Sequence, residues 1–260
     1  IALNFLGDCI FCFNYSKIYG DNLDNKASVI KQFGAGVYIA GLKVNNGITY
    51  ATISKLEEIS GAILWQKELN LPSEIMDLEY MPLDPNSGSP VEGIIIVGRT
   101  LPFTNAGLPQ DNKSFIFSLD ASTGNIIASK LYDSRGRESF NRIIRHPNPA
   151  NSAFPYYVLG SVNVNNNPSF PPPSSVDNVV LVNLNVNLVN NYFSLYSGLN
   201  TNISEIDLEF SRGIIPLNSS NILLVGNRTN AFGWGALVKI NGLTGAILYA
   251  TSYQNSMDIL

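Results

Sequence analysis

The stretch Gly36-Val-Tyr-Ile-Ala-Gly41 is an apolar run that ends in glycine, and similar runs return three times along the chain. The later copies are Ile94-Ile-Ile-Val-Gly98, Tyr156-Tyr-Val-Leu-Gly160 and Ile222-Leu-Leu-Val-Gly226. Their glycines fall about sixty residues apart, and a fixed period of this kind is the signature of a repeated structural unit. The chain is therefore expected to consist of repeated units of about sixty residues.

Each repeat continues with further short segments of strand character. In the first repeat, Tyr50–Leu56 follows the run, and a Ser60-Gly61 turn leads into Ala-Ile-Leu-Trp65. An acidic segment closes the unit. Two copies of it are nearly identical in sequence, Glu74-Ile-Met-Asp-Leu-Glu79 and Glu205-Ile-Asp-Leu-Glu209. β-branched and aromatic runs separated by Gly, Asn and Pro predict strands, and we find no convincing helical period. The sequence predicts four-stranded antiparallel units.

Several small sheets in one chain must bury both faces against their neighbours, and a β-propeller does so radially. We predict an all-β propeller with four full four-stranded blades and partial blade strands at both ends. The predicted boundaries, within a single domain or domain fragment of residues 1–260, are a partial blade at 1–20, blades near 24–70, 73–133, 138–197 and 203–254, and the start of another at 255–260. A five-bladed ring and a larger propeller cut at both ends are equally consistent with this register.

The turn motifs carry a resemblance to known repeats. Asp120-x-x-Thr123-Gly124, Asn241-x-x-Thr244-Gly245 and Glu57-x-x-Ser60-Gly61-x-x-x-Trp65 resemble the aspartate, Thr-Gly and Trp repeat of quinoprotein-like propellers. The Gly36–Gly41 run followed by Ile63-Leu-Trp-x-Lys67 is similar to repeats of exported bacterial surface propellers. This resemblance implies an exported bacterial protein at the cell surface or outside the cell, with the periplasm as an alternative.

The amino-acid composition argues against some classes of binding partner. Charged residues make up 14% of the chain against a usual quarter, and the net charge is −4. Side-chain amides and hydroxyls must therefore supply much of the polar surface. No Lys/Arg cluster is present, which argues against nucleic acid as a partner, and no apolar stretch is long enough for a spanning helix. The opening residues lack Met and a basic region, so we expect a mature or partial gene product. The expected partner is another protein or a glycan.

Candidate catalytic and metal-binding residues are sparse. Cys9 and Cys12 form a C-x-x-C, but on a strand positions three apart point to opposite faces, so we predict that the two thiols are not disulfide-bonded. Zinc would need ligands that a chain with one histidine and no further cysteine does not supply. That histidine, His146, accompanies no recognisable nucleophile motif and is interpreted as a loop residue. We predict no catalytic residue, no metal site and no cofactor.

The acidic segments admit two interpretations. Asp77 and Glu79 match Asp207 and Glu209, and alternation places such carboxylates on one side of a strand that should line the propeller channel. They could hold an ion, or they could form a structural lining that is hydrated or paired with arginines such as Arg142 and Arg212. We favour the structural lining, and the sequence leaves ion binding open.

One face of the predicted propeller collects long connections. The loops between second and third strands grow from 43–48 to 99–113 and 161–177. Long loops in compact domains are often functional, and aromatic and arginine side chains are typical anchors of recognition surfaces. The candidate binding residues on this face are Arg99, Phe103, Arg135, Arg137, Phe170, Phe232 and Trp234. The alternative is that loop tips merely tolerate insertions and that Trp234 fills the blade beneath it.

These observations favour a non-catalytic propeller that binds a protein or glycan, or acts as a scaffold, through this face. One alternative is a structural subunit of a larger surface or secretion assembly. Another is a propeller enzyme of quinoprotein-like or hydrolase type. The enzymatic part of the resemblance fails, because Trp stands in the repeat position only at Trp65 and no adjacent cysteines are present.

Overall fold

The structure is a computed structural model that describes residues 25–82, 91–101, 113–133, 137–147, 153–163, 177–196, 208–228 and 234–254. The regular elements in these ranges are β-strands without a helix, so the all-β prediction is confirmed. Accordingly, the described ranges hold no helix that could cross a bilayer. The strands are β1 (Asn25–Phe33), β2 (Gly36–Asn45), β3 (Ile48–Glu57), β4 (Ile63–Met81), β5 (Gly93–Thr100), β6 (Ser114–Asp120), β7 (Ile126–Tyr132), β8 (Arg137–Arg145), β9 (Tyr156–Asn163), β10 (Asp177–Leu184), β11 (Asn190–Tyr196), β12 (Leu208–Asn218), β13 (Asn221–Arg228), β14 (Trp234–Asn241) and β15 (Ile247–Gln254).

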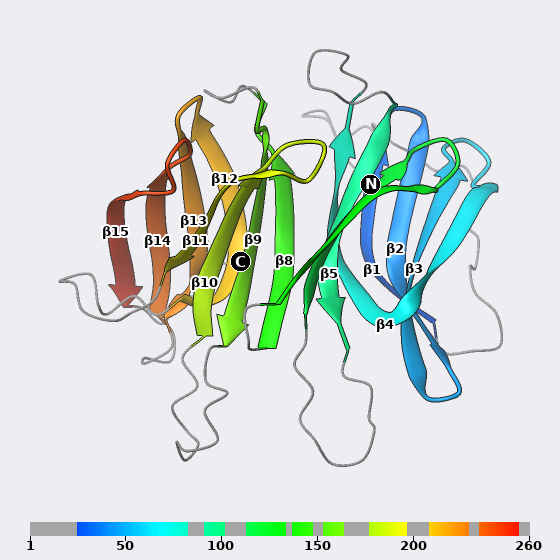
Figure 1. Cartoon of the computed structure of the whole chain (residues 1–260), viewed down its shortest axis with the longest axis horizontal. Helices are drawn as coiled ribbons and strands as arrows, with labels where there is room; N and C mark the ends of the chain where they lie inside the picture. The colour runs from blue at the N-terminus through cyan, green and yellow to red at the C-terminus, as the bar shows by residue number, and fades with distance from the viewer. Residues whose placement is uncertain are drawn as a thin grey trace, which may run out of the picture. The chain divides into compact units, whose positions relative to one another are not determined.

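Hydrogen bonding joins neighbouring strands into three sheets, shown in Figure 1. The sheets are β1 to β7 in chain order, β8 to β11, and β12 to β15. The sequence predicts a separate strand at each end of the segment 63–81, whereas β4 is one continuous strand of 19 residues. The register of β4 with β3 shifts near Pro72, so the strand bends at a bulge there and does not end.

The chain divides into two compact units, Ile1–Ile75 and Met76–Leu260, and the boundary falls inside β4. The strands form four groups in chain order. The first group is β1, β2, β3 and residues 63–75 of β4, and the second is residues 76–81 of β4 with β5, β6 and β7. The third group is β8 to β11, and the fourth is β12 to β15. Each group thus repeats the predicted four-stranded antiparallel order.

In three of the four groups, the glycine that ends the repeated run faces a bulge in the first strand of its group. In three groups the glycine lies opposite a residue that is followed by a register shift: Gly41 opposite Ala27, Gly160 opposite Phe140 and Gly226 opposite Ser211. A Cβ added to Gly160 would lie 2.3 Å from the carbonyl oxygen of Ser139, and one added to Gly41 would lie 2.1 Å from that of Lys26. The close approach of the first strand explains why the run must end in glycine, and the predicted equivalence is confirmed in these groups.

A shared turn joins the third strand to the fourth. The Asp120 side chain accepts the backbone N–H of Thr123 at 2.9 Å, and its carbonyl accepts the N–H of Gly124 at 2.8 Å. Gly124 has a φ of 69°, a left-handed conformation that glycine adopts without a steric penalty. The turns that begin at Glu57 and Asn241 repeat these contacts, with Gly61 and Gly245 in the left-handed position.

The third group closes its turn differently. Asn185 accepts the backbone N–H groups of Asn187 and Val189 on its side chain, and Leu188 takes the left-handed position with a φ of 59°. A leucine is strained in this conformation. Its side chain is buried in the large apolar cluster of the second and third groups, and this burial compensates for the strained backbone.

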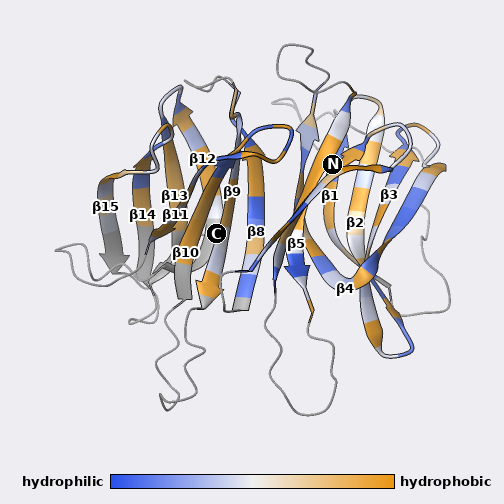
Figure 2. Cartoon of the chain, viewed as in Figure 1, coloured by the Kyte–Doolittle hydropathy of each residue, from blue (hydrophilic) through white to orange (hydrophobic). Residues whose placement is uncertain are grey.

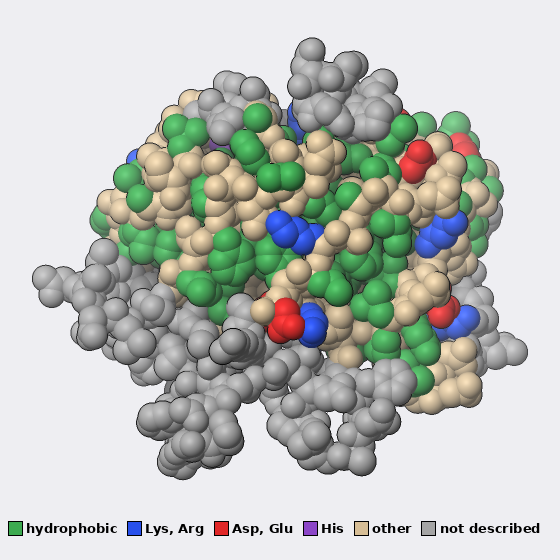
Figure 3. Space-filling view, in the orientation of Figure 1, with side chains coloured by type: hydrophobic (Ala, Val, Ile, Leu, Met, Phe, Trp, Pro, Cys, Tyr) green, Lys and Arg blue, Asp and Glu red, His purple; other side chains and the backbone are tan. Residues whose placement is uncertain are grey.

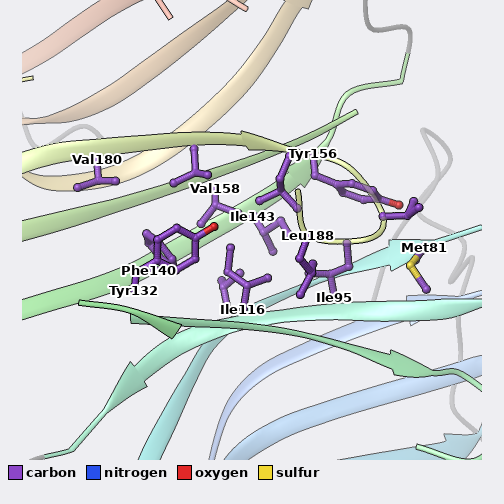
Figure 4. Close-up of a cluster of buried hydrophobic side chains, with 14 of the residues drawn as sticks. Met81, Ile95, Ile116, Tyr132, Phe140, Ile143, Tyr156, Val158, Val180 and Leu188 are labelled. Carbon is purple, nitrogen blue, oxygen red and sulfur yellow. The ribbon is translucent and has the colours of Figure 1, made fainter. Parts of the chain in front are cut away.

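That cluster forms the core of the second unit. It includes Ile95 and Ile116 of the second group and Phe140, Ile143 and Val158 of the third. Figure 4 shows Tyr132 beside Phe140 and Leu188 among these side chains. A further cluster joins the third and fourth groups through Leu159, Leu181, Leu224 and Val238. Figure 2 shows the apolar residues gathered along β9 and β10, the central strands of the third group, which is covered on both faces.

The fourth strand of one group also binds the turn of the next group or the residue that directly follows this turn. Tyr132 donates its hydroxyl proton to Oδ1 of Asn190 at 2.8 Å, and Tyr196 donates to the carbonyl oxygen of Gly245 at 2.6 Å. The two tyrosines stand at the same distance along the chain from their own left-handed turn residues, Gly124 and Leu188. The contact is therefore repeated from one group to the next.

Candidate recognition face

The two ends of the strand groups differ in their connections. We call the end where second strands lead into third strands the recognition end, and its connections are 46–47, 101–113, 164–176 and 229–233. We call the opposite end the locking end. Long connections are not confined to the recognition end, because β4 ends at Met81 before β5 begins at Gly93, and β8 ends at Arg145 before β9 begins at Tyr156. Connection length alone therefore does not identify the working face.

Three predicted binding residues lie on described strands. Arg99 is near the end of β5, Arg137 begins β8 and Trp234 begins β14. Their partners are Ser114, Asn163 and Gln254, so each of the three lies at the recognition end of its own group. Phe103, Arg135, Phe170 and Phe232 lie outside the described residues, as do Cys9 and Cys12. The face therefore remains a prediction for these side chains.

The base of the 101–113 connection is held by polar contacts. The backbone N–H of Thr100 donates to the carbonyl of Lys113 at 2.8 Å, and the N–H of Lys113 donates to Oγ1 of Thr100 at 2.9 Å. The Lys113 ammonium lies 2.6 Å from a carboxylate oxygen of Asp133, and both side chains are exposed. An exposed ion pair contributes little to stability, so it mainly joins two connections at this end. Figure 3 shows that charged side chains are scattered sparsely over the viewed face.

The locking end uses its polar groups to tie the third group to the fourth. His146 directly follows β8, is buried, and places Nε2 2.7 Å from the carbonyl oxygen of Asn218. Since a carbonyl only accepts, Nε2 carries the proton and donates it. Tyr157 donates its hydroxyl to the carbonyl of Gly242 at 3.0 Å, and Asn191 donates to that of Leu243 at 3.2 Å. The predicted loop histidine is thus a buried connector between groups.

Two tyrosines near the same end act as hydrogen-bond donors. Tyr80 donates to the carboxylate of Glu92, and Tyr156 donates to the backbone carbonyl of Tyr80 at 3.2 Å. Burial, together with the hydrogen bond and the negative charge of Glu92, raises the pKa of Tyr80 to about 12. Burial also raises the pKa of Tyr156 above its ordinary value. Both phenols keep their protons near neutral pH, so they hold neighbouring segments together as neutral donors.

The acidic segment of the second group has a structural role. Asp77 is buried, and its Oδ2 accepts the backbone N–H of Ile143 in β8 at 3.0 Å, while Oδ1 accepts that of Leu78 at 2.9 Å. This contact ties β4 to β8 and supports the structural interpretation of Asp77. Among the described residues, no three side chains of the metal-ligating types gather in one place. Asp207 lies outside the described residues, and for Glu209 the structure describes the backbone alone.

Sequence reasoning missed the residues that join the groups. Asn190 accepts from Lys130 at 2.9 Å as well as from Tyr132, although nothing in its own surroundings marks it as a contact residue. A signal was present in the repeat, because Tyr132 and Tyr196 occupy equivalent positions after their turns. A tyrosine repeated at one position of the outer strands and wholly or partly buried there is expected to find a hydrogen-bond partner.

No family model matches the chain, and no curated protein matches it. A solved structure of a neuraminidase-like protein from A/bat/Guatemala/164/2009 is similar to the chain, with a TM-score of 0.50 at 13% sequence identity. The similarity covers 91% of this chain and 56% of the neuraminidase-like chain, so this chain spans little more than half of that length. That neighbour is a propeller, and a likeness at such low identity shows a propeller-like fold alone.

Two further structures give weaker matches. A eukaryotic initiation factor matches with a TM-score of 0.37 at 11% identity, covering 86% of this chain and 55% of its own. An acylaminoacyl peptidase of Pyrococcus horikoshii matches with a TM-score of 0.31 at 10% identity, covering 89% of this chain and 45% of its own.

Proposed function

We propose that the chain is part of an exported bacterial propeller that binds another protein or a glycan through its recognition end, without chemistry. The observation that carries this proposal is the different use of polar groups at the two ends. At the locking end, His146, Tyr157 and Asn191 reach the next strand group and hydrogen-bond to its backbone. Groups engaged in this way support the fold and are not available to a partner.

The residue types of the recognition end suit a binding surface. Aromatic and arginine side chains dominate binding hot spots because they bury a large area and make several directed contacts. The proposed anchors are Arg99, Phe103, Arg135, Arg137, Phe170, Phe232 and Trp234. Arg99, Arg137 and Trp234 start from strand ends, where a paired backbone fixes their positions.

The low charge of the chain supports a place outside the cell. With 14% charged residues, recognition relies on amide and hydroxyl hydrogen bonds around the aromatic and arginine anchors. Such surfaces suit glycans as well as protein surfaces with exposed backbone.

Binding of the chain to an array of defined glycans and to a panel of purified cell-surface proteins tests this proposal. A variant that combines Arg99→Ala, Phe103→Ala and Phe170→Ala should bind its ligand at least about 30-fold more weakly, the effect of losing one good hot spot. Its circular dichroism and thermal midpoint should match those of the parent chain, because two of the three residues lie in connections.

The matched control combines Asn187→Ala and Ser219→Ala, two exposed positions in turns of the locking end. This control should bind as tightly as the parent chain. If the control loses binding while the recognition-end variant keeps it, the wrong face has been assigned. If the chain converts a glycan or peptide instead of only binding it, the non-catalytic proposal fails.

A further inference from the structure

A lysine amine of the second group lies against the side-chain amide of an asparagine in the third. Lys130 stands on β7, and its Nζ donates to Oδ1 of Asn190 at 2.9 Å and to the carbonyl oxygen of Leu188 at 3.2 Å. Since a lysine ammonium only donates hydrogen bonds, the atom that faces it is the amide oxygen and not the amide nitrogen. The carbonyl carbon of this amide, Cγ, is about 1.2 Å from its oxygen, so it lies within about 4.1 Å of Nζ.

A second donor polarises the same amide. Tyr132, labelled in Figure 4, donates its hydroxyl proton to Oδ1 of Asn190 at 2.8 Å. Burial raises the pKa of Tyr132 above its ordinary value, so the phenol keeps its proton and remains a donor. Two donors on one carbonyl oxygen draw electron density away from Cγ. They are also placed to stabilise the negative charge that develops on this oxygen when a nucleophile attacks the carbon.

The amine and the leaving group suit such an attack. Burial lowers the pKa of Lys130 below its ordinary value, which increases the fraction of neutral, nucleophilic amine. Nζ lies 5.1 Å from the centroid of the Tyr132 ring, and this contact keeps the amine beside the amide. Within the described ranges, Nδ2 of Asn190 makes no hydrogen bond, so nothing retains this nitrogen when its bond to Cγ breaks.

We propose that Lys130 and Asn190 form an intramolecular amide bond that joins the second strand group covalently to the third. Nζ of neutral Lys130 attacks Cγ of Asn190, and the Tyr132 hydroxyl donates a hydrogen bond to the oxyanion. A proton passes from Nζ to Nδ2, the Cγ–Nδ2 bond breaks, and ammonia leaves as the carbonyl forms again. The chain loses one ammonia, and no oxidant or co-reactant is needed. The proposal goes beyond the recognition function and does not depend on it.

The repeat restricts this bond to one of the described junctions. Lys67 stands in the first group where Lys130 stands in the second, six residues after the left-handed residue of its turn. In the second group, however, the position of Asn190 holds Ile126, which has no amide. In the third group, the position of Lys130 holds Ser194, which has no amine. Lys67 is therefore a lysine of the same repeat position without an asparagine to react with.

Intact-mass spectrometry of the full chain tests the proposal. Freshly refolded chain holds the pair as a hydrogen bond, because most of a lysine amine is protonated near neutral pH. During incubation of the folded chain at mildly alkaline pH, its mass should fall by about 17 Da, the mass of one ammonia. Trypsin should then release residues 114–135 joined to residues 146–212, because it no longer cleaves after the modified Lys130. Chain incubated in urea should keep its full mass, because the two side chains are then no longer held together.

Three variants assign the reaction to its residues. Lys130→Arg keeps a charged donor but has no nucleophilic amine, so it should keep its full mass. Tyr132→Phe should lose ammonia about a hundredfold more slowly, because the oxyanion loses a donor. The matched control is Lys67→Arg, which should lose ammonia at the rate of the parent chain. Circular dichroism checks that each variant is folded like the parent.

Two results would overturn the proposal. One is a folded parent chain that still has its full mass after several weeks of incubation. The other is an equal loss of ammonia in the parent chain and in Lys130→Arg, which would place the reaction at a different asparagine. An unchanged rate in Tyr132→Phe would remove Tyr132 from the reaction and contradict its role as the oxyanion donor.

Discussion

At some positions of this chain, the close approach of a neighbouring strand allows only glycine. Gly160 has no room for a side chain, since an added Cβ would lie 2.3 Å from the carbonyl of Ser139 and 3.1 Å from the Cα of Phe140. Gly213 also lies on a strand, but the nearest atom to its added Cβ is 3.5 Å away, at ordinary contact distance. Glycine is therefore sterically required at position 160, whereas at position 213 the strand has room for a small side chain.

We expect Gly160→Ala to lower the free energy of unfolding by about 3 kcal/mol, the upper range of overpacking costs, because backbone must move to make space. Gly213→Ala should change it by less than about 1 kcal/mol, and in the stabilising direction, because alanine restricts the unfolded chain. Urea unfolding of both variants measures the difference. Equal losses in the two variants would show that the bulge can relax.

The turn carboxylate Asp120 links stability to pH. The hydrogen bond from the Ser122 hydroxyl, followed by those from the backbone N–H groups of Ser122 and Thr123, holds the pKa of Asp120 below its ordinary value. A depressed pKa means that the folded state favours the charged form, so this contribution is complete above the pKa of the unfolded chain, about 4. It is lost as the pH falls through the lower pKa of the folded state.

Asn241 makes the same turn without a charge, and this suggests the test. Asp120→Asn should have nearly the same stability as the parent chain at pH 7 and should lack the acid-dependent loss at this site. The difference between the two proteins in urea unfolding should therefore change as the pH is lowered below about 4. Asp120→Ala should be less stable by about 1 kcal/mol already at pH 7, because the turn loses its acceptor. A difference between parent and Asp120→Asn that is constant with pH would contradict the assignment.

At the scale of elements, the groups are joined through an outer strand and a turn as well as through apolar faces. Tyr132 packs edge-on against Phe140, with ring centroids 4.9 Å apart, and stacks on Phe193 at 5.9 Å. Its hydroxyl reaches Asn190 in the next group. The aromatic body thus contributes packing while the polar tip fixes the position of the neighbouring strand.

A double-mutant cycle measures this contact. Tyr132→Phe and Asn190→Ala should each destabilise the chain, and the double variant should lose less than the sum by about 1 kcal/mol, the net value of one hydrogen bond. The matched cycle with Asn187→Ala, an exposed residue in the same turn, should be additive. Additivity in both cycles would mean that the hydroxyl contributes nothing to joining the groups.

The elements also show which parts of the fold the sequence could predict. Strand periodicity, the repeated glycine and the Thr-Gly turn depend on local residues, so the four-stranded order and the turns beginning at Glu57, Asp120 and Asn241 were predictable. The continuity of β4 was not, because Pro72 reads locally as a break and only the pairing with β3 bends the strand instead. Nor was the burial of His146, since its partner Asn218 is distant in sequence.

At the scale of the whole molecule, the candidate binding face stays a prediction. Antiparallel strand order places Arg99, Arg137 and Trp234 at the same end of their groups. The side chains in the connections lack any such local rule, because no hydrogen-bonded ladder or apolar period determines their directions. Their roles therefore need the binding experiment.

The 101–113 connection should serve binding and not stability. We expect that replacing residues 101–112 with Asn-Gly, the turn that joins β2 to β3 with φ values of 52° and 76°, preserves the fold. A shorter loop lowers the entropic cost of bringing the two strand ends together. The free energy of unfolding should therefore stay the same or rise by about 1 to 2 kcal/mol. Calorimetry and the glycan and protein panels measure stability and binding separately. Unfolding of this variant would show that the connection supports the core.

The repeated tyrosine contact has a consequence for how such a chain can evolve. Tyr132 binds Asn190, the first residue after the turn of the third group, and the third group supplies Tyr196, which binds the turn of the fourth. The third group thus carries both an acceptor for the group before it and a donor for the group after it, whereas the first group has Leu69 at the position of the tyrosine. Duplicating the third group within the gene would place a matching donor and acceptor at the new junction at once. A lineage of this repeat can therefore gain a copy of the third group in a single genetic event, without first acquiring compensating substitutions in the groups on either side.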